Sequence, residues 1–302
     1  MRRILACTAS LLLSACASLQ LSLPAITESP TGEHHAGRIV WHDLLTDEPE
    51  AVRTFYTTLF GWEFEPVGLD IGLGDGPGYY LIRHQGRLIA GMADLNQIDT
   101  GGRDKERLSQ WVALMSVADV DAAAARVAAA AGRVLTPPTD VADRGRLALI
   151  EDNQGAFIAL LEARDGDPPE TDAPIGGFLW DELWARDVEA ATQFYVSVTG
   201  VASADYPIDA QRSYRYLASH GGPRAGILPR PDDELPPVWV SYLRVADAEA
   251  ITAQVPALGG RVLLAPQPRE VGGEVAVITD PSGAGLALQT WEEGRHLAGH
   301  AE

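Results

Sequence analysis

The chain has 302 residues, of which 46% are hydrophobic and 22% are charged. This length accommodates two domains of ordinary size, and the apolar content is that of a folded protein rather than a disordered one. A formal net charge of −19 excludes a surface that attracts nucleic acid or anionic lipid headgroups, so we expect no nucleic-acid partner.

The first residues have the pattern of a bacterial export signal. Arg2 and Arg3 precede an apolar run, Ile4–Leu13, which is too short to span a bilayer that needs about 20 residues. The sequence Leu-Ser-Ala-Cys that ends at Cys16 resembles the lipobox of bacterial lipoproteins. The resemblance implies cleavage after residue 15, a lipid anchor at Cys16, and a place in the cell envelope, at the outer membrane facing the periplasm. The alternative is a buried apolar N-terminal helix.

Residues 16–37 are predicted to be a lipidated cysteine followed by a tether, because they are rich in Ser, Pro, Thr and Gly and show no periodicity. Cys7 lies within the signal, so the mature chain would keep one cysteine and form no internal disulfide. Loss of Arg2 and Arg3 would leave 21 basic against 42 acidic residues. Membrane contact would therefore come from the anchor alone.

The next stretch, WHDLLTDEPEAVRTFYTTLFG from Trp41 to Gly61, is repeated as WDELWARDVEAATQFYVSVTG from Trp180 to Gly200. Each copy opens with the alternating pattern of a strand and becomes helical near Glu48 or Asp187. We expect the acid or a nearby polar residue to cap each helix and the terminal glycines to end them. A Phe-Tyr pair lies on the apolar face of both helices.

A second repeat follows inside each copy, from Trp111 (WVALMSVADV) and from Trp239 (WVSYLRVADA). Each copy therefore contains two units of a strand, a helix and about three strands. The predicted fold class is α+β, with domains at residues 38–164 and 176–292, a linker at 165–175 and a tail at 293–302. The difference in residue number between equivalent positions of the two copies changes only in predicted loops, which supports the strand assignments.

The repeated βαβββ unit, the acid-started helix with its Phe-Tyr pair, and the Asp-x-x-Gly turn before the last strand resemble the vicinal oxygen chelate (VOC) superfamily, which includes glyoxalase I, bleomycin-resistance proteins and extradiol dioxygenases. The resemblance covers nearly all of the mature chain. It implies that two units form a cupped barrel of about eight strands, that a ligand or metal lies in the cup, and that the two domains pair within the chain.

The resemblance also implies where metal ligands would stand. The family places them on the first strand, on the first strand of the second unit and on the terminal strand. In this chain those positions hold Trp41, Val112 and Ala159 in the first copy and Trp180, Val240 and Ala287 in the second. Trp, Val and Ala cannot donate electrons to a divalent ion. We therefore expect no metal and no cofactor in either cup.

The remaining polar candidates in the cups are two carboxylates. Alternate residues of a strand share a face, so Asp43 lies on the same face as Trp41, and Glu182 on the same face as Trp180. Each acid has three possible roles: hydrogen bonding to backbone or an arginine, contact with a ligand, or general-base catalysis. His42, on the opposite face, is expected under the helix or at a domain contact.

Three functions remain open. The leading one is metal-independent binding of a small aromatic or amphipathic molecule to Trp41, Trp180, Asp43 or Glu182. The second is a glyoxalase-like lyase or isomerase with Asp43 or Glu182 as the catalytic base. The third is an envelope interaction protein whose cups are filled by side chains.

Overall fold

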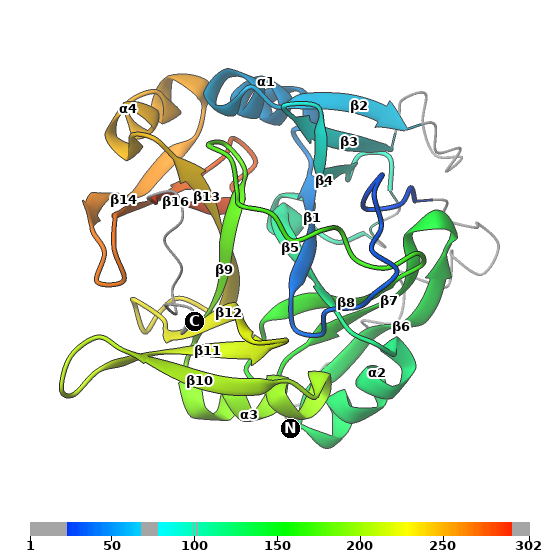
Figure 1. Cartoon of the computed structure of the whole chain (residues 1–302). Helices are drawn as coiled ribbons and strands as arrows, with labels where there is room; N and C mark the ends of the chain where they lie inside the picture. The colour runs from blue at the N-terminus through cyan, green and yellow to red at the C-terminus, as the bar shows by residue number, and fades with distance from the viewer. Residues whose placement is uncertain (1–22, 68–77, 99, 101, 292–302) are drawn as a thin grey trace, which may run out of the picture.

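The computed structural model describes residues 23–67, 78–98, 100 and 102–291 (Figure 1). Cys16 and the predicted tail at 293–302 lie outside these residues. Within the described part of the chain, no helix combines the length and apolar character needed to cross a membrane.

Each copy of the repeat forms one eight-stranded mixed sheet, which confirms the predicted α+β fold. The first sheet has the order β2-β3-β4-β1-β5-β8-β7-β6 and the second the equivalent order β10-β11-β12-β9-β13-β16-β15-β14. The first contains β1 (Ile39–Thr46), β2 (Glu63–Val67), β3 (Tyr79–His84), β4 (Arg87–Asp94), β5 (Gln110–Ser116), β6 (Arg133–Val141), β7 (Gly145–Glu151) and β8 (Phe157–Ala163). The second contains β9 (Phe178–Ala185), β10 (Ala202–Pro207), β11 (Ser213–Ser219), β12 (Gly222–Pro229), β13 (Val238–Val245), β14 (Arg261–Pro268), β15 (Glu274–Thr279) and β16 (Gly285–Thr290).

Within the described ranges, four α-helices accompany the sheets: α1 (Pro49–Phe60), α2 (Val120–Ala129), α3 (Val188–Thr199) and α4 (Ala248–Thr252). Three start at an aspartate whose side chain accepts a hydrogen bond from the amide three residues on, as expected of an N-cap: Asp119, Asp187 and Asp247. Glu48 stands at the N-cap position of α1, but its side chain makes no capping bond, and its amide donates to Oγ1 of Thr46. Left-handed Gly61 and Gly200 end α1 and α3.

The helix-bearing faces of the two sheets pack against each other. One apolar cluster combines the second half of the first copy with the first half of the second copy, and another combines the remaining halves. Figure 1 shows α2 beside α3 at one end of this interface and α1 beside α4 at the other. The opposite face of each sheet forms a cup, called here the first cup and the second cup.

Two reciprocal hydrogen bonds connect the copies. Tyr56 of α1 donates to Asp280 in the second copy at 3.2 Å, and Tyr195 of α3 donates to Asp152 in the first copy at 3.1 Å. Burial raises the pKa of Asp280 to about 6 and also raises the pKa of Asp152. The duplicated Phe-Tyr pair and the duplicated aspartate turn are thus two halves of one interdomain contact.

His42 lies at the centre of the interface, as the domain-contact expectation proposed. Its Nε2 is 2.8 Å from Oδ1 of Asp181, the residue at the equivalent position of the second copy. Ser241 donates to the same oxygen at 2.7 Å, and Phe178 stacks on the imidazole at 3.8 Å between ring centroids. The two copies therefore meet through unlike side chains at this position.

The prediction of a tether over residues 16–37 is wrong for residues 23–37, the part of it that the structure describes. Leu23 and Ile26 are 8% and 3% exposed and belong to the apolar cluster of the first cup. Further along, the amide of His35 donates to the buried Asp167 carboxylate at 2.6 Å. Composition suggested an unstructured segment, but these residues bury apolar side chains against a distant part of the chain.

Candidate functional site

The six positions at which the family places metal ligands lie in the two cups. Trp41, Val112 and Ala159 belong to the first-cup cluster or pack against it, and Trp180, Val240 and Ala287 do the same in the second. The strand alternation predicted from sequence is therefore correct: Trp41 and Asp43 face one cup, and Trp180 and Glu182 face the other.

In the first cup, Asp43 is held by three side chains. Oδ1 accepts hydrogen bonds from Nε1 of Trp41 at 2.8 Å and from the Tyr79 hydroxyl at 2.6 Å. Oδ2 pairs with Arg144 at 2.9 Å, and the same guanidinium donates to Tyr79 at 2.7 Å. Arg144 is completely buried, and its guanidinium lies over the rings of Trp41 and Tyr79. Of the three roles considered for Asp43, this geometry matches pairing with an arginine.

In the second cup, Glu182 also has three donor side chains, two of which are tyrosines. The hydroxyls of Tyr214 and Tyr242 each donate to one of its oxygens at 2.5 Å, and Arg269 forms an ion pair with it. Burial, followed by the neighbouring carboxylate, raises the pKa of both tyrosines, so their hydroxyls stay protonated and donate. Trp180 donates from Nε1 to Tyr214 at 2.6 Å.

A repeated glycine makes room for each carboxylate. A Cβ on Gly91 would lie 1.7 Å from the Tyr79 hydroxyl, and one on Gly226 would lie 2.2 Å from the Tyr214 hydroxyl. Tyr79 and Gly91 are each separated from their counterparts by 135 positions, so the duplication held a signal for this contact. Our sequence reasoning missed these tyrosines.

Two further site residues, Arg144 and Arg269, were also missed. They come from corresponding connections, before β7 and before β15, but they are 125 positions apart, whereas the flanking repeats are 128 apart. A gapless comparison of the copies therefore does not align them. Tyr242 has no counterpart either, because Leu114 stands at the equivalent position of the first copy.

The cups differ in how they are filled. The first-cup cluster includes Leu23 and Ile26, and Trp41 is only 1% exposed. In the part of the chain that the structure describes, the second-cup cluster contains residues of β9 and β13 to β16 only, and its two tryptophans, Trp180 and Trp184, are partly buried. Among the described residues, aromatic surface is thus accessible in the second cup and covered in the first.

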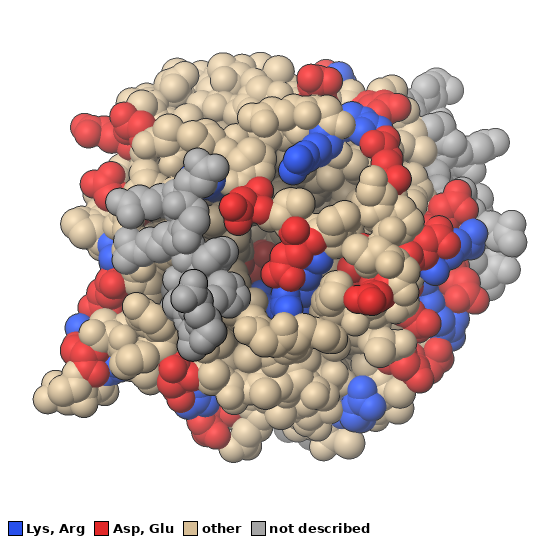
Figure 2. Space-filling view, viewed as in Figure 1, with Lys and Arg blue, Asp and Glu red and all other residues tan. Residues whose placement is uncertain are grey.

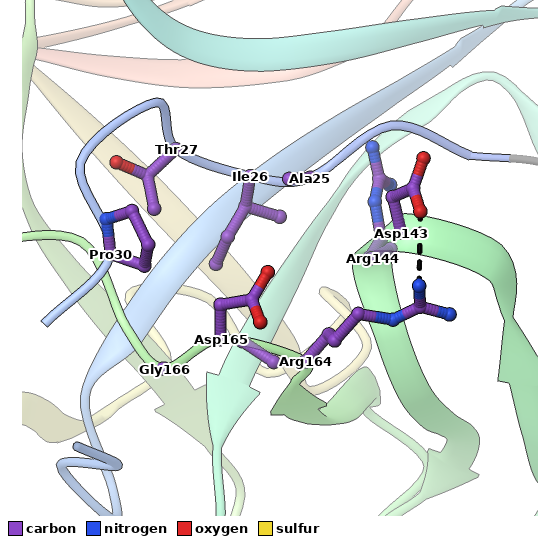
Figure 3. Close-up of a pocket in the computed structure, with 10 residues that line it drawn as sticks. Ala25, Ile26, Thr27, Pro30, Asp143, Arg144, Arg164, Asp165 and Gly166 are labelled. Atoms are coloured by element: carbon purple, nitrogen blue, oxygen red, sulfur yellow. Dashed lines mark hydrogen bonds and ion pairs between the residues drawn. The ribbon is translucent and has the colours of Figure 1, made fainter. Parts of the chain in front are cut away.

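A small cavity marks where the N-terminal segment covers the first cup. It has a volume of about 210 Å³, open solvent included, and lies between the segment at Ile26, Thr27 and Pro30 and the rim at Arg144 and Arg164 (Figure 3). On the face drawn in Figure 2, acidic side chains are scattered among uncharged ones, many of them near a basic side chain. This distribution agrees with the net charge of −19.

The residues at the family's ligand positions do not fit a divalent ion. The only polar atom of the Trp41 side chain is an N–H that donates to Asp43, and Ala159 is packed in the apolar cluster. Among the described residues, no group of three or more His, Cys, Asp or Glu side chains is arranged to hold a metal ion. The side chains at the family's ligand positions offer a divalent ion no ligand atom.

The sequence matches the model of the Glyoxalase/Bleomycin resistance protein/Dioxygenase superfamily over residues 35–160 and 177–288. The chain belongs to this superfamily. It is 31% identical over 252 residues to "Putative glyoxylase CFP32" of Mycobacterium bovis, a match that covers 83% of this chain and 94% of that protein. It is 32% identical over 272 residues to "Anthracycline biosynthesis protein DnrV" of Streptomyces peucetius, covering 85% and 94%.

Solved structures of the superfamily share the fold. The Mn(II)-bound glyoxalase from Novosphingobium aromaticivorans has a TM-score of 0.58 at 16% identity, with 88% of this chain and 86% of that chain covered. A catechol 2,3-dioxygenase has a TM-score of 0.54 at 14% identity, covering 89% and 96%. At these identities the likeness establishes the fold of this superfamily member and says nothing of its reaction or ligand.

Proposed function

We propose that this VOC-superfamily protein binds a small aromatic or amphipathic molecule in its second cup without using a metal. The observation that carries the proposal is the partly buried pair Trp180 and Trp184 on the strand face that also presents Glu182 and its partners. Pockets that bind small molecules typically combine apolar and aromatic walls with a few convergent polar groups.

The second cup indicates the chemistry of its ligand. Tryptophan offers a flat apolar surface on which an aromatic ring stacks. Arg269 is 12% exposed at its side chain and lies beside two tyrosine hydroxyls, so a ligand oxygen that accepts hydrogen bonds suits this end of the cup. The kinship with proteins of anthracycline biosynthesis supports an oxygenated fused-ring ligand, because anthracyclines are compounds of that kind.

Binding is tested with a dihydroxyanthraquinone as the probe. We expect saturable quenching of tryptophan fluorescence and one bound probe per chain by native mass spectrometry. Trp180→Ala should weaken binding at least tenfold. If the probe binds equally well to this variant, or not at all to the parent protein, the proposed site is wrong.

A glyoxalase-like lyase or isomerase is the second candidate function. One observation favours it: Glu182, 1% exposed at its side chain, adjoins Arg269, so a candidate base stands next to a cation that would stabilise a developing enolate oxygen. The test is deuterium uptake from D₂O at the carbon beside a carbonyl of an aromatic α-hydroxyketone, followed by NMR. Uptake that is lost in Glu182→Gln supports catalysis, and uptake unaffected by this variant contradicts it.

We further propose that the protein is exported and anchored to the outer membrane through lipid on Cys16. The sequence before Cys16 supports this proposal. Cells given radiolabelled palmitate should label the parent protein, whereas Cys16→Ser should be unlabelled and released from membranes. Equal membrane association of both forms would contradict it.

A further inference from the structure

The first cup contains a piece of its own chain. Leu23 and Ile26 are buried in the same apolar cluster as Trp41 and Leu161. Between them, the Pro24 carbonyl oxygen accepts a hydrogen bond from Nε of Arg144 at 3.2 Å. Four consecutive residues thus present an apolar side chain, an accepting oxygen and a second apolar side chain to the cup.

This segment is held more firmly downstream than at the cup. At residues 31 and 32 the backbone amides donate to carbonyls of Asp167 and Asp165 at 3.0 Å each. Closer to the cup, Glu28 pairs with Arg83 at 2.6 Å, but its side chain is 64% exposed. Exposed ion pairs contribute little to stability, so this contact fixes the segment only weakly.

The segment is open to solvent on one side of its site. A hollow of about 210 Å³, open solvent included, lies against Ile26, Thr27 and Pro30, on the side facing Arg144 and Arg164 (Figure 3). The hydrophobic gain from two buried side chains is of the same order as the entropy lost by ordering four residues. The free energy of the chain with the segment in the cup is therefore close to that with the segment released.

We propose that the first cup is a binding site for an elongated apolar ligand that presents an accepting oxygen to Arg144, and that residues 23–26 are its displaceable occupant. This site is distinct from the second cup and does not depend on binding there. The occupied state keeps Trp41 covered, and release of the segment exposes the indole, the buried guanidinium and the apolar strand faces together.

The test uses the full chain and the dye 1-anilinonaphthalene-8-sulfonate, which joins an apolar ring system to an accepting sulfonate. Combined Leu23→Asp and Ile26→Asp changes should release the segment. We expect one more equivalent of bound dye than in the parent protein, with near-UV circular dichroism retained. Adding Ala159→Phe, which fills the base of the first cup, should remove that equivalent. The parent protein serves as the control for dye bound in the second cup.

Three outcomes would overturn the proposal: no additional dye, additional dye that Ala159→Phe leaves in place, or loss of near-UV dichroism in the double variant. The last outcome would make the segment an integral part of the core. Limited proteolysis of the unaltered chain gives an independent measurement. We expect cleavage within residues 23–30 under native conditions while the rest stays folded. Cleavage there that occurs only with global unfolding contradicts a displaceable segment.

Discussion

The two cups are built from the same repeated residues and have different contents. Each has a tryptophan, a carboxylate, a tyrosine and an arginine from corresponding elements. The first cup adds Leu23 and Ile26 from outside the repeat, and its arginine is completely buried. The second adds Tyr242, and its tryptophans remain partly exposed. Duplication thus preserved a buried charged pair while only one copy kept an accessible aromatic surface.

Removing the arginine from each cup gives the largest expected effect. Arg144→Ala should lower the free energy of unfolding by about 3–5 kcal/mol, because it leaves Asp43 in a covered cup without its cation. Each carboxylate keeps two other donors, so the difference comes from the arginines: Arg269→Ala should cost less, since the Arg269 side chain is 12% exposed and that of Arg144 is completely buried. Urea denaturation of both variants measures the difference. Equal losses would contradict the contrast between a covered and an open cup.

The contact between Tyr56 and Asp280, which joins the two copies, should make the stability of the protein depend on pH. The pKa of Asp280 is raised to about 6 in the folded protein, so its contribution to stability is greatest below pH 4 and falls as the pH rises through 6. A shift of this size corresponds to about 3 kcal/mol. Asp280→Asn should remove this decline, as measured by denaturation from pH 4 to 7. An unchanged pH profile would show that the carboxyl titrates normally.

A matched pair of isosteric changes tests which carboxylate serves the ligand. Glu182→Gln should raise the dissociation constant of the dihydroxyanthraquinone about tenfold, equivalent to about 1.4 kcal/mol, because it disturbs the Tyr214, Tyr242 and Arg269 arrangement. Asp43→Asn should leave it unchanged, since that acid lies in the covered cup. Fluorescence titration of both variants decides. If the two changes weakened binding of the dihydroxyanthraquinone equally, the assignment of its site to the second cup would be wrong.

Much of this arrangement was predictable from sequence, for identifiable physical reasons. The repeat gave the fold, and the two-residue period of a strand placed Asp43 and Glu182 in the cups. The constant spacing of Tyr79 and Gly91 from their counterparts carried a further signal that went unused. These features share one property: they depend on local periodicity or on comparison of the copies.

The rest depended on contacts between distant parts of the chain. Arg144 and Arg269 reach their carboxylates from connections that differ in length between the copies, and no local sequence pattern predicts such contacts. Residues 23–26 have the composition of a tether, and only the presence of an apolar cup across the chain makes them a buried segment. The composition of a segment indicates how it behaves in isolation, whereas burial of residues 23–26 depends on the first cup.

A crystal structure of the protein soaked with the dihydroxyanthraquinone tests the central claim most directly. The account predicts the ring system against Trp180 and Trp184 with an oxygen directed at Arg269, and Leu23 and Ile26 still in the first cup. A second cup left empty, with the ring system bound elsewhere, would contradict it.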